Sequence, residues 1–134
     1  MKSQLSFHHI GYATKKISNE INFFLNMGYV LEGDYFEDTL QGVRGCFMHG
    51  NGPRIELLEN LPTHHTLDTW VENGIKMYHM AFLCDNLDSN IEIFIKSGNK
   101  VVCKPTPAAA FNGRKICFIM LKNFQLIELI EHYE

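Results

Sequence analysis

Two histidines and two glutamates occupy matching places in the two halves of the sequence. His9 and His79 lie seventy residues apart, and Glu56 and Glu128 lie seventy-two apart. Each histidine has small neighbours along a run of β-forming residues, and each glutamate stands inside an apolar run. A carboxylate in an apolar strand is costly to bury unless it is paired or binds a metal. The pattern therefore predicts one divalent cation held by two imidazoles and two carboxylates.

Other segments repeat at nearly the same offset, which indicates a tandem duplication. Gly45-Cys46-Phe47 matches Ile116-Cys117-Phe118, and the run 55–59 matches the run 127–131. In each half, a Ser-Asn pair precedes apolar residues at helical spacing and a glycine stop, which is typical of a capped helix. The two halves are therefore expected to fold alike.

Each half predicts the element order strand, helix, strand, strand, strand, and hence an α+β fold of tandem βαβββ modules. The first module is expected near 5–60, with strands 6–14, 29–36, 43–49 and 54–59 and a helix 18–27. The second is expected near 76–132, with strands 77–84, 99–104, 114–121 and 124–131 and a helix 88–97. A short helix is expected near 67–73 in the linker 61–75, and residues 1–134 are expected to form a single domain.

Composition narrows the range of partners and locations. Hydrophobic residues make up 46% and charged residues 20%, with a net charge of −3, which is typical of a packed globular chain. We expect no nucleic-acid partner, because no basic cluster exceeds Lys15-Lys16. No apolar run is long enough for a membrane span, and the first residues lack the apolar core of a signal peptide. The four cysteines form no CxxC pair, which favours reduced thiols in a cytoplasmic protein.

Four short motifs resemble the vicinal-oxygen-chelate superfamily, which includes glyoxalase I, methylmalonyl-CoA epimerase, bleomycin- and fosfomycin-resistance proteins and extradiol dioxygenases. They are HxGxA from His9, IEL around Glu56, HxAF from His79 and IEL around Glu128. The resemblance extends from Phe7 to Glu131. It implies the glyoxalase fold, in which paired βαβββ modules form a curved mixed sheet around a metal site. It also implies a homodimer, with the metal either within one chain or shared across the interface.

The resemblance makes His9, Glu56, His79 and Glu128 the metal ligands, a set that bacterial glyoxalase I also uses. The metal implied is Zn, Ni, Co, Mn or Fe. The nearest branches are methylmalonyl-CoA epimerase and glyoxalase I. The segment 54–62 is similar to the epimerase branch, whereas Leu40 and the loop 109–114 depart from it.

These branches imply a lyase or isomerase that transfers a proton next to a metal-bound carbonyl of a small carbonyl or thioester substrate. Glu128 or Glu56 is expected to carry the proton, with Glu37 or Asp38 as alternatives at the margin. In the loop 105–114, Phe111 is expected to pack on the substrate, and Arg114 or the adjacent Lys115 is expected to meet an anionic group. The other wall is expected to contain three further substrate-binding residues: Phe36, Arg44 and Met48.

Two alternative functions fit the same fold. One is a non-catalytic small-molecule binding or resistance protein, and the four predicted ligands argue against it. The other is an Fe(II) extradiol dioxygenase, whose site normally has two histidines and one glutamate. Here Glu56 would be an additional carboxylate in the coordination position that such a site keeps open, which argues against oxygen chemistry.

Overall fold

The chain folds into two compact units. The computed structural model describes residues 4–132. Among the described residues, the first unit is His9–Tyr78, and the second combines residues 4–8 with residues 79–132. The chain therefore passes from one unit to the other inside strand β1 (Ser6–Ala13) and again inside strand β5 (Met77–Cys84).

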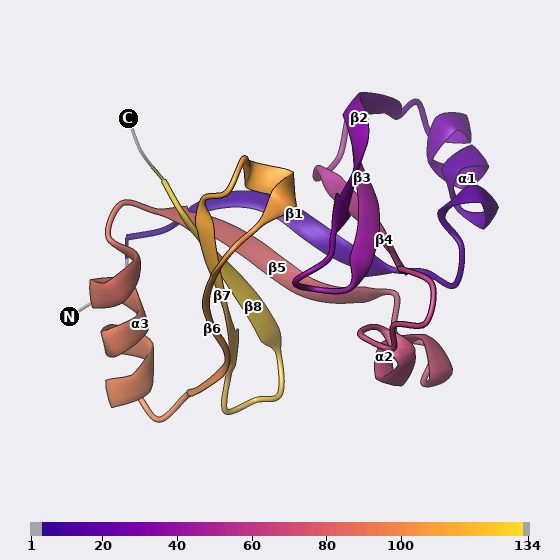
Figure 1. Cartoon of the computed structure of the whole chain (residues 1–134). Helices are drawn as coiled ribbons and strands as arrows, with labels where there is room; N and C mark the ends of the chain where they lie inside the picture. Colours follow the sequence, from indigo (N-terminus) through magenta and orange to yellow (C-terminus); the bar gives the residue numbers. More distant parts are fainter. Residues whose placement is uncertain (1–3, 133–134) are drawn as a thin grey trace. The chain divides into compact units, whose positions relative to one another are not determined.

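The first unit continues from β1 through the elements that Figure 1 labels between β1 and β5. These are the 3-10 turn η1 (Ile17–Asn19), α1 (Ile21–Asn26), β2 (Val30–Asp38), β3 (Val43–His49), β4 (Ile55–Asn60) and α2 (Asp68–Glu72). The strand order is β2-β3-β4-β1. Strands β1 and β4 are parallel, whereas β2, β3 and β4 pair antiparallel.

The second unit repeats this plan. After β5 come α3 (Leu87–Lys96), β6 (Lys100–Pro107), the 3-10 turn η2 (Ala109–Phe111), β7 (Lys115–Met120) and β8 (Leu126–Glu131). The strand order is β6-β7-β8-β5, again with one parallel pair, β5 with β8. The predicted fold class, tandem βαβββ modules in a mixed eight-stranded sheet, is confirmed.

Alternation along the strands separates a helix-covered face from a second face in each unit. In β4, Ile55 and Leu57 pack in a core cluster with Phe24 of α1, so Glu56 between them points to the other face. In β8, Ile127 and Leu129 pack with residues of α3, and Glu128 between them points away from that helix. The duplicated hydrophobic pattern thus turns each glutamate away from the helix of its own unit.

The helices begin at different residues from those predicted. Helix α3 begins one residue earlier, because the side chain of Asn86 accepts a hydrogen bond from the Ser89 amide at 3.0 Å and caps it. In the first unit, Ser18 lies inside the 3-10 turn and does not cap α1. The amide of Ile17 donates instead to the Glu59 carboxylate at 2.9 Å, and α1 is only six residues long.

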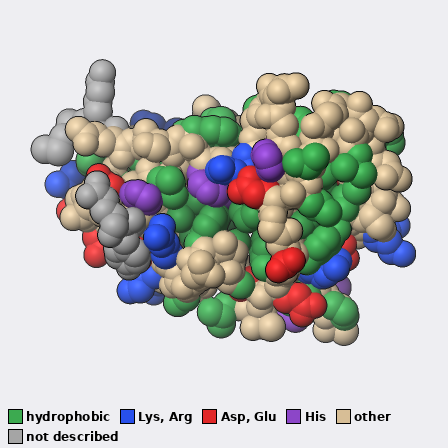
Figure 2. Space-filling view, turned by 90° about the horizontal axis from the view of Figure 1, so that it is seen from above, with side chains coloured by type: hydrophobic (Ala, Val, Ile, Leu, Met, Phe, Trp, Pro, Cys, Tyr) green, Lys and Arg blue, Asp and Glu red, His purple; other side chains and the backbone are tan. Residues whose placement is uncertain are grey.

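The surface of the described chain mixes apolar and charged side chains. Phe23, Leu40 and Phe124 are among the large apolar side chains that are exposed. On the face in Figure 2, Lys and Arg side chains lie in small groups separated by acidic and apolar side chains. Within residues 4–132, no helix has the length and apolar character needed to cross a membrane.

Candidate metal centre

In the first unit, His9 and Glu56 form a buried pair on the face away from α1. The parallel register sets Glu56 of β4 opposite Gly11 of β1, and His9 lies two residues earlier on the same face. The Nε2 atom of His9 is 3.2 Å from Oε1 of Glu56. The exposed fractions are 0% for His9 and 5% for Glu56. The pair is thus shielded from bulk water.

The second unit holds His79 and Glu128 in the same arrangement. The register of β5 and β8 sets Glu128 opposite Ala81, and His79 lies two residues earlier. The Nε2 atom of His79 is 3.3 Å from Oε1 of Glu128, and the residues are 1% and 3% exposed. The residues opposite the two glutamates are therefore Gly11 and Ala81, and their small size leaves room beside each histidine.

The donor types of these pairs fit a divalent transition metal. An ionised carboxylate without a charged or hydrogen-bonded partner is costly in an apolar interior, and here each carboxylate faces an imidazole nitrogen. Imidazole nitrogen with carboxylate oxygen suits Zn, Ni, Co, Mn and Fe(II). All four residues are buried and of types that ligate metals.

An aromatic ring packs on each of these histidines, which the sequence interpretation did not anticipate. The rings of His9 and Phe47 are 5.2 Å apart and inclined at 76°, and those of His79 and Phe118 are 5.2 Å apart at 83°. Phe47 and Phe118 are repeat-equivalent residues, at the ends of the matching Cys-Phe pairs. The duplication was therefore the signal that could have revealed them.

The predicted substrate residues of the first unit are divided between the two faces. Phe36 shares the Glu56 face, where its ring lies 6.0 Å from that of Phe47. Arg44 and Met48 were expected on the same wall, but the structure places them elsewhere. Their positions alternate with Phe47 along β3, so both lie on the helix-covered face.

Their contacts on that face are structural. Met48 is fully buried in the core cluster with Phe24. The Arg44 guanidinium lies over the Tyr35 ring at 4.4 Å, and its Nη1 is 3.5 Å from the Glu59 carboxylate. We therefore drop Arg44 and Met48 from the candidate substrate-binding residues.

In the second unit, the connection between β6 and β7 brings Phe111 to the face that carries Glu128. Phe111 packs against a cluster of buried residues that includes Ala81 and Ile130, which share that face. The ring of Phe111 also meets that of His8 at 5.4 Å. Arg114 follows at the end of the connection, half-buried, with its amide bonded to the Phe111 carbonyl.

The family is decided by a sequence comparison. A model described as the glyoxalase/bleomycin resistance protein/dioxygenase superfamily matches residues 8–118. The chain belongs to this superfamily. A comparison with curated protein sequences finds no match.

Solved structures share the superfamily fold over nearly the whole chain. A hypothetical protein from Bacillus halodurans C-125 is 23% identical, with a TM-score of 0.84 and coverage of 98% of this chain and 97% of that one. Methylmalonyl-CoA epimerase from Mycobacterium tuberculosis is 21% identical, with a TM-score of 0.81 and coverage of 100% and 93%. A variant of the Streptomyces coelicolor epimerase in complex with 2-nitronate-propionyl-CoA is 21% identical, with a TM-score of 0.76 and coverage of 98% and 100%.

Two other acidic residues, Asp38 and Glu131, have local hydrogen-bond partners. Asp38, at the end of β2, is buried and accepts hydrogen bonds from the amide and side chain of Gln41 at 3.0 and 2.8 Å. These contacts close the turn between β2 and β3. Glu131, on the other face of β8 from Glu128, accepts from the Lys115 amide at 3.3 Å. Glu37 is exposed.

Three of the four cysteines are buried, and all four are free thiols. Burial is the main cause that raises the pKa of Cys84 to about 11, with a smaller contribution from Asp85. Burial also raises the pKa of Cys117 to about 11. Metal binding by cysteine requires the thiolate, so these two thiols are poor ligands at neutral pH.

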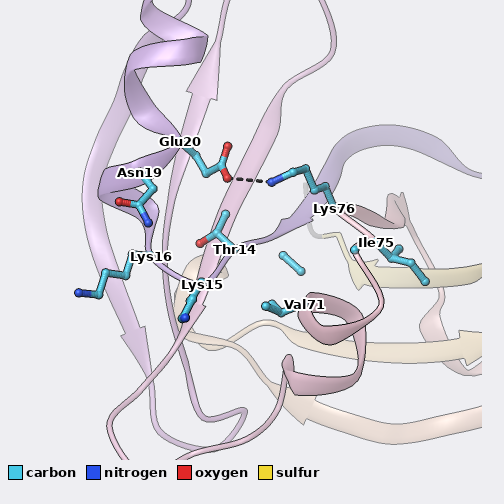
Figure 3. Close-up of a pocket in the computed structure, with 10 residues that line it drawn as sticks. Thr14, Lys15, Lys16, Asn19, Glu20, Val71, Ile75 and Lys76 are labelled. Carbon is cyan, nitrogen blue, oxygen red and sulfur yellow. Dashed lines mark hydrogen bonds and ion pairs between the residues drawn. The ribbon is translucent and has the colours of Figure 1, made fainter.

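A separate cavity of about 130 Å³ lies in the first unit between the segment from the end of β1 to η1 and the segment from α2 to the loop before β5. Figure 3 shows Lys15, Lys16 and Lys76 around it, with the Lys76 ammonium paired to Glu20 at 2.9 Å. None of the four histidine and glutamate residues of the two pairs lines it. It is therefore distinct from the His9–Glu56 pair.

Proposed function

We propose that this protein is a divalent-metal-dependent lyase or isomerase that moves a proton next to a carbonyl group, of the glyoxalase I or acyl-CoA epimerase type. The observation that carries the proposal is the duplicated pair. His9 with Glu56 and His79 with Glu128 have nearly equal nitrogen–oxygen distances, 3.2 and 3.3 Å, and are all buried. The superfamily membership and the epimerases among the similar structures support it.

We infer that all four side chains hold one cation, Zn, Ni, Co, Mn or Fe. His9 and His79 would bind through Nε2, the atom that each turns toward its glutamate. A bound divalent ion supplies Lewis acidity that polarises a substrate carbonyl and stabilises negative charge on its oxygen. The residue types fit this role without any cysteine ligand.

In this proposal a glutamate carries the proton. Glu128 or Glu56 accepts the proton from the carbon next to the carbonyl and returns it to the product. Both carboxylates are nearly buried, with exposed fractions of 5% for Glu56 and 3% for Glu128. Phe36 and Phe111, which lie on the glutamate faces, would contact the apolar part of the substrate, and Arg114 an anionic group.

The substrate class that we propose is a small acyl-CoA thioester or a 2-oxo hemithioacetal. One similar epimerase structure holds 2-nitronate-propionyl-CoA, which favours the thioester. We further propose a homodimer, as the superfamily resemblance implies, and a cytoplasmic location, which the free and mostly buried thiols favour.

Proton exchange at the carbon next to the carbonyl tests the proposal. The metal-loaded protein is incubated in deuterated water with both substrate classes, and loss of the proton signal is followed by NMR. We expect exchange with at least one class, at least 10²-fold slower after Glu128→Gln or Glu56→Gln if that residue carries the proton. Glu131→Gln is the matched control, because Glu131 lies on the same strand but the opposite face.

The proposal fails if neither class exchanges, or if both glutamine variants exchange at the wild-type rate. Tight ligand binding without exchange would favour the binding-protein alternative. Oxygen uptake by the iron-loaded protein with a panel of catechols would favour the dioxygenase alternative.

A further inference from the structure

Each histidine of the two pairs meets a phenylalanine in the same geometry. The ring centroids are 5.2 Å apart in both units, and the ring planes are inclined at 76° for His9 with Phe47 and 83° for His79 with Phe118. Edge-to-face packing at this distance is a favourable aromatic arrangement. The contact is therefore duplicated along with the His–Glu pair.

The strand order explains why these rings meet. In the first unit, β4 lies between β1 and β3, so His9 and Phe47 project from the strands on either side of Glu56. The register sets Phe47 directly opposite Glu56. In the second unit, β8 lies between β5 and β7, and Phe118 is directly opposite Glu128. The strand of each glutamate thus lies between a strand that carries the histidine and a strand that carries the phenylalanine.

Such a contact restricts the orientation of the imidazole. Rotation of a histidine ring about its second side-chain torsion has broad minima, so neighbours must fix the direction of Nε2. The phenylalanine occupies one side of the ring while Nε2 faces the glutamate. A ligand held in one orientation loses less rotational freedom when it binds a metal.

The two phenylalanines are themselves held by residues from segments that differ between the modules. Phe47 is backed by Phe36 of β2, whose ring lies over Gly45, where a Cβ atom would approach Phe36 Cζ to 2.5 Å. Phe118 packs against the same buried cluster as Phe111 of η2. Phe36 and Phe111, which have no counterpart in the other module, thus support the two repeated histidine–phenylalanine contacts.

We propose that Phe47 and Phe118 are positioning residues that orient the His9 and His79 imidazoles for the metal. This inference rests on the proposed metal centre and adds two residues that do not themselves ligate or react. Phe36 and Phe111 support them from the two segments that we expect to face the substrate.

The test is Co(II) binding to Phe47→Leu and Phe118→Leu, measured by competition with a chelator and by visible absorption. The matched control is Phe82→Leu, because Phe82 is also half-buried but packs on the helix-covered face and against Phe7. We expect each test variant to bind Co(II) roughly twofold to tenfold more weakly than wild type, as loss of one aromatic contact predicts. We also expect an altered ligand-field spectrum, which loss of fold stability alone would not produce.

The outcomes separate this inference from the proposed function. If the wild type binds no Co(II), the metal centre itself is wrong. If the wild type binds Co(II) and both test variants match Phe82→Leu in affinity and spectrum, the positioning role is wrong and the metal centre stands. If a leucine variant does not fold, Phe47→Met or Phe118→Met is measured against Phe82→Met with the same criteria.

Discussion

Removal of His79 from the metal-free protein should destabilise the fold more than loss of its packing alone. Glu128 is 3% exposed, and its Oε1 lies 3.3 Å from the imidazole Nε2. His79→Ala leaves that carboxylate buried without this imidazole. Breaking a buried ionic or hydrogen-bonded pair in this way costs about 3–5 kcal/mol, a large part of the stability of a typical small domain.

The second variant, His79→Ala with Glu128→Gln, removes the charge together with the imidazole. A buried neutral amide costs less than a buried carboxylate, so we expect the double variant to recover about 1–3 kcal/mol relative to His79→Ala. The free energy of unfolding is measured by urea denaturation near pH 7.5 after chelator treatment, with the slope checked for constancy. Glu131→Gln is the matched substitution on the helix-covered face of β8.

The expectation is contradicted if the double variant loses at least as much free energy of unfolding as His79→Ala alone. Such a result would mean that the carboxylate of Glu128 is not stabilised by the imidazole in the metal-free state. A loss below about 0.5 kcal/mol for His79→Ala would contradict it too, because ordinary surface substitutions have effects of that size.

Two further predictions concern packing and protonation. Gly45→Ala should lower the free energy of unfolding by about 1–3 kcal/mol, because the new methyl group would lie 2.5 Å from Phe36 Cζ; urea denaturation checks it, and an unchanged midpoint would contradict it. The raised pKa values of Cys84 and Cys117, about 11, mean that the folded chain holds thiol protons that the unfolded chain releases above about pH 9. Stability should therefore fall between pH 9 and about 11, and Cys84→Ala with Cys117→Ala should flatten that fall; equal slopes in thermal unfolding would count against it.

Sequence reasoning was strongest where the duplication supplied two independent copies of each pattern. The apolar residues around Glu56 and Glu128 predicted strands, and in the structure both glutamates lie on the strand face away from the helix. The same duplication predicted that the two histidines, and likewise the two glutamates, occupy equivalent positions in the two modules. The pairing His9–Glu56 and His79–Glu128 follows from parallel registers that are equal in both units.

The errors occurred where a single residue of register decides the face. Met48 and Arg44 were expected at the substrate wall, but antiparallel pairing sets Phe47 opposite Glu56 and turns both of its neighbours to the helix-covered face. Pattern alone does not give that register, because an apolar run such as 46–48 fits either face. The start of α1 was misplaced for a related reason, since the Glu59 carboxylate that binds the Ile17 amide comes from a strand distant in sequence.

Metal stoichiometry is the decisive measurement for the proposal that His9, Glu56, His79 and Glu128 hold a single ion. Purified protein loaded with Zn(II) or Co(II) and freed of excess metal is analysed for bound metal per chain, alongside His9→Ala and His79→Ala. We expect one tightly bound ion per wild-type chain and loss of tight binding in both variants. Two ions per chain, with one retained in each variant, would show that each pair binds its own ion and would contradict it, as would wild-type protein that retains none.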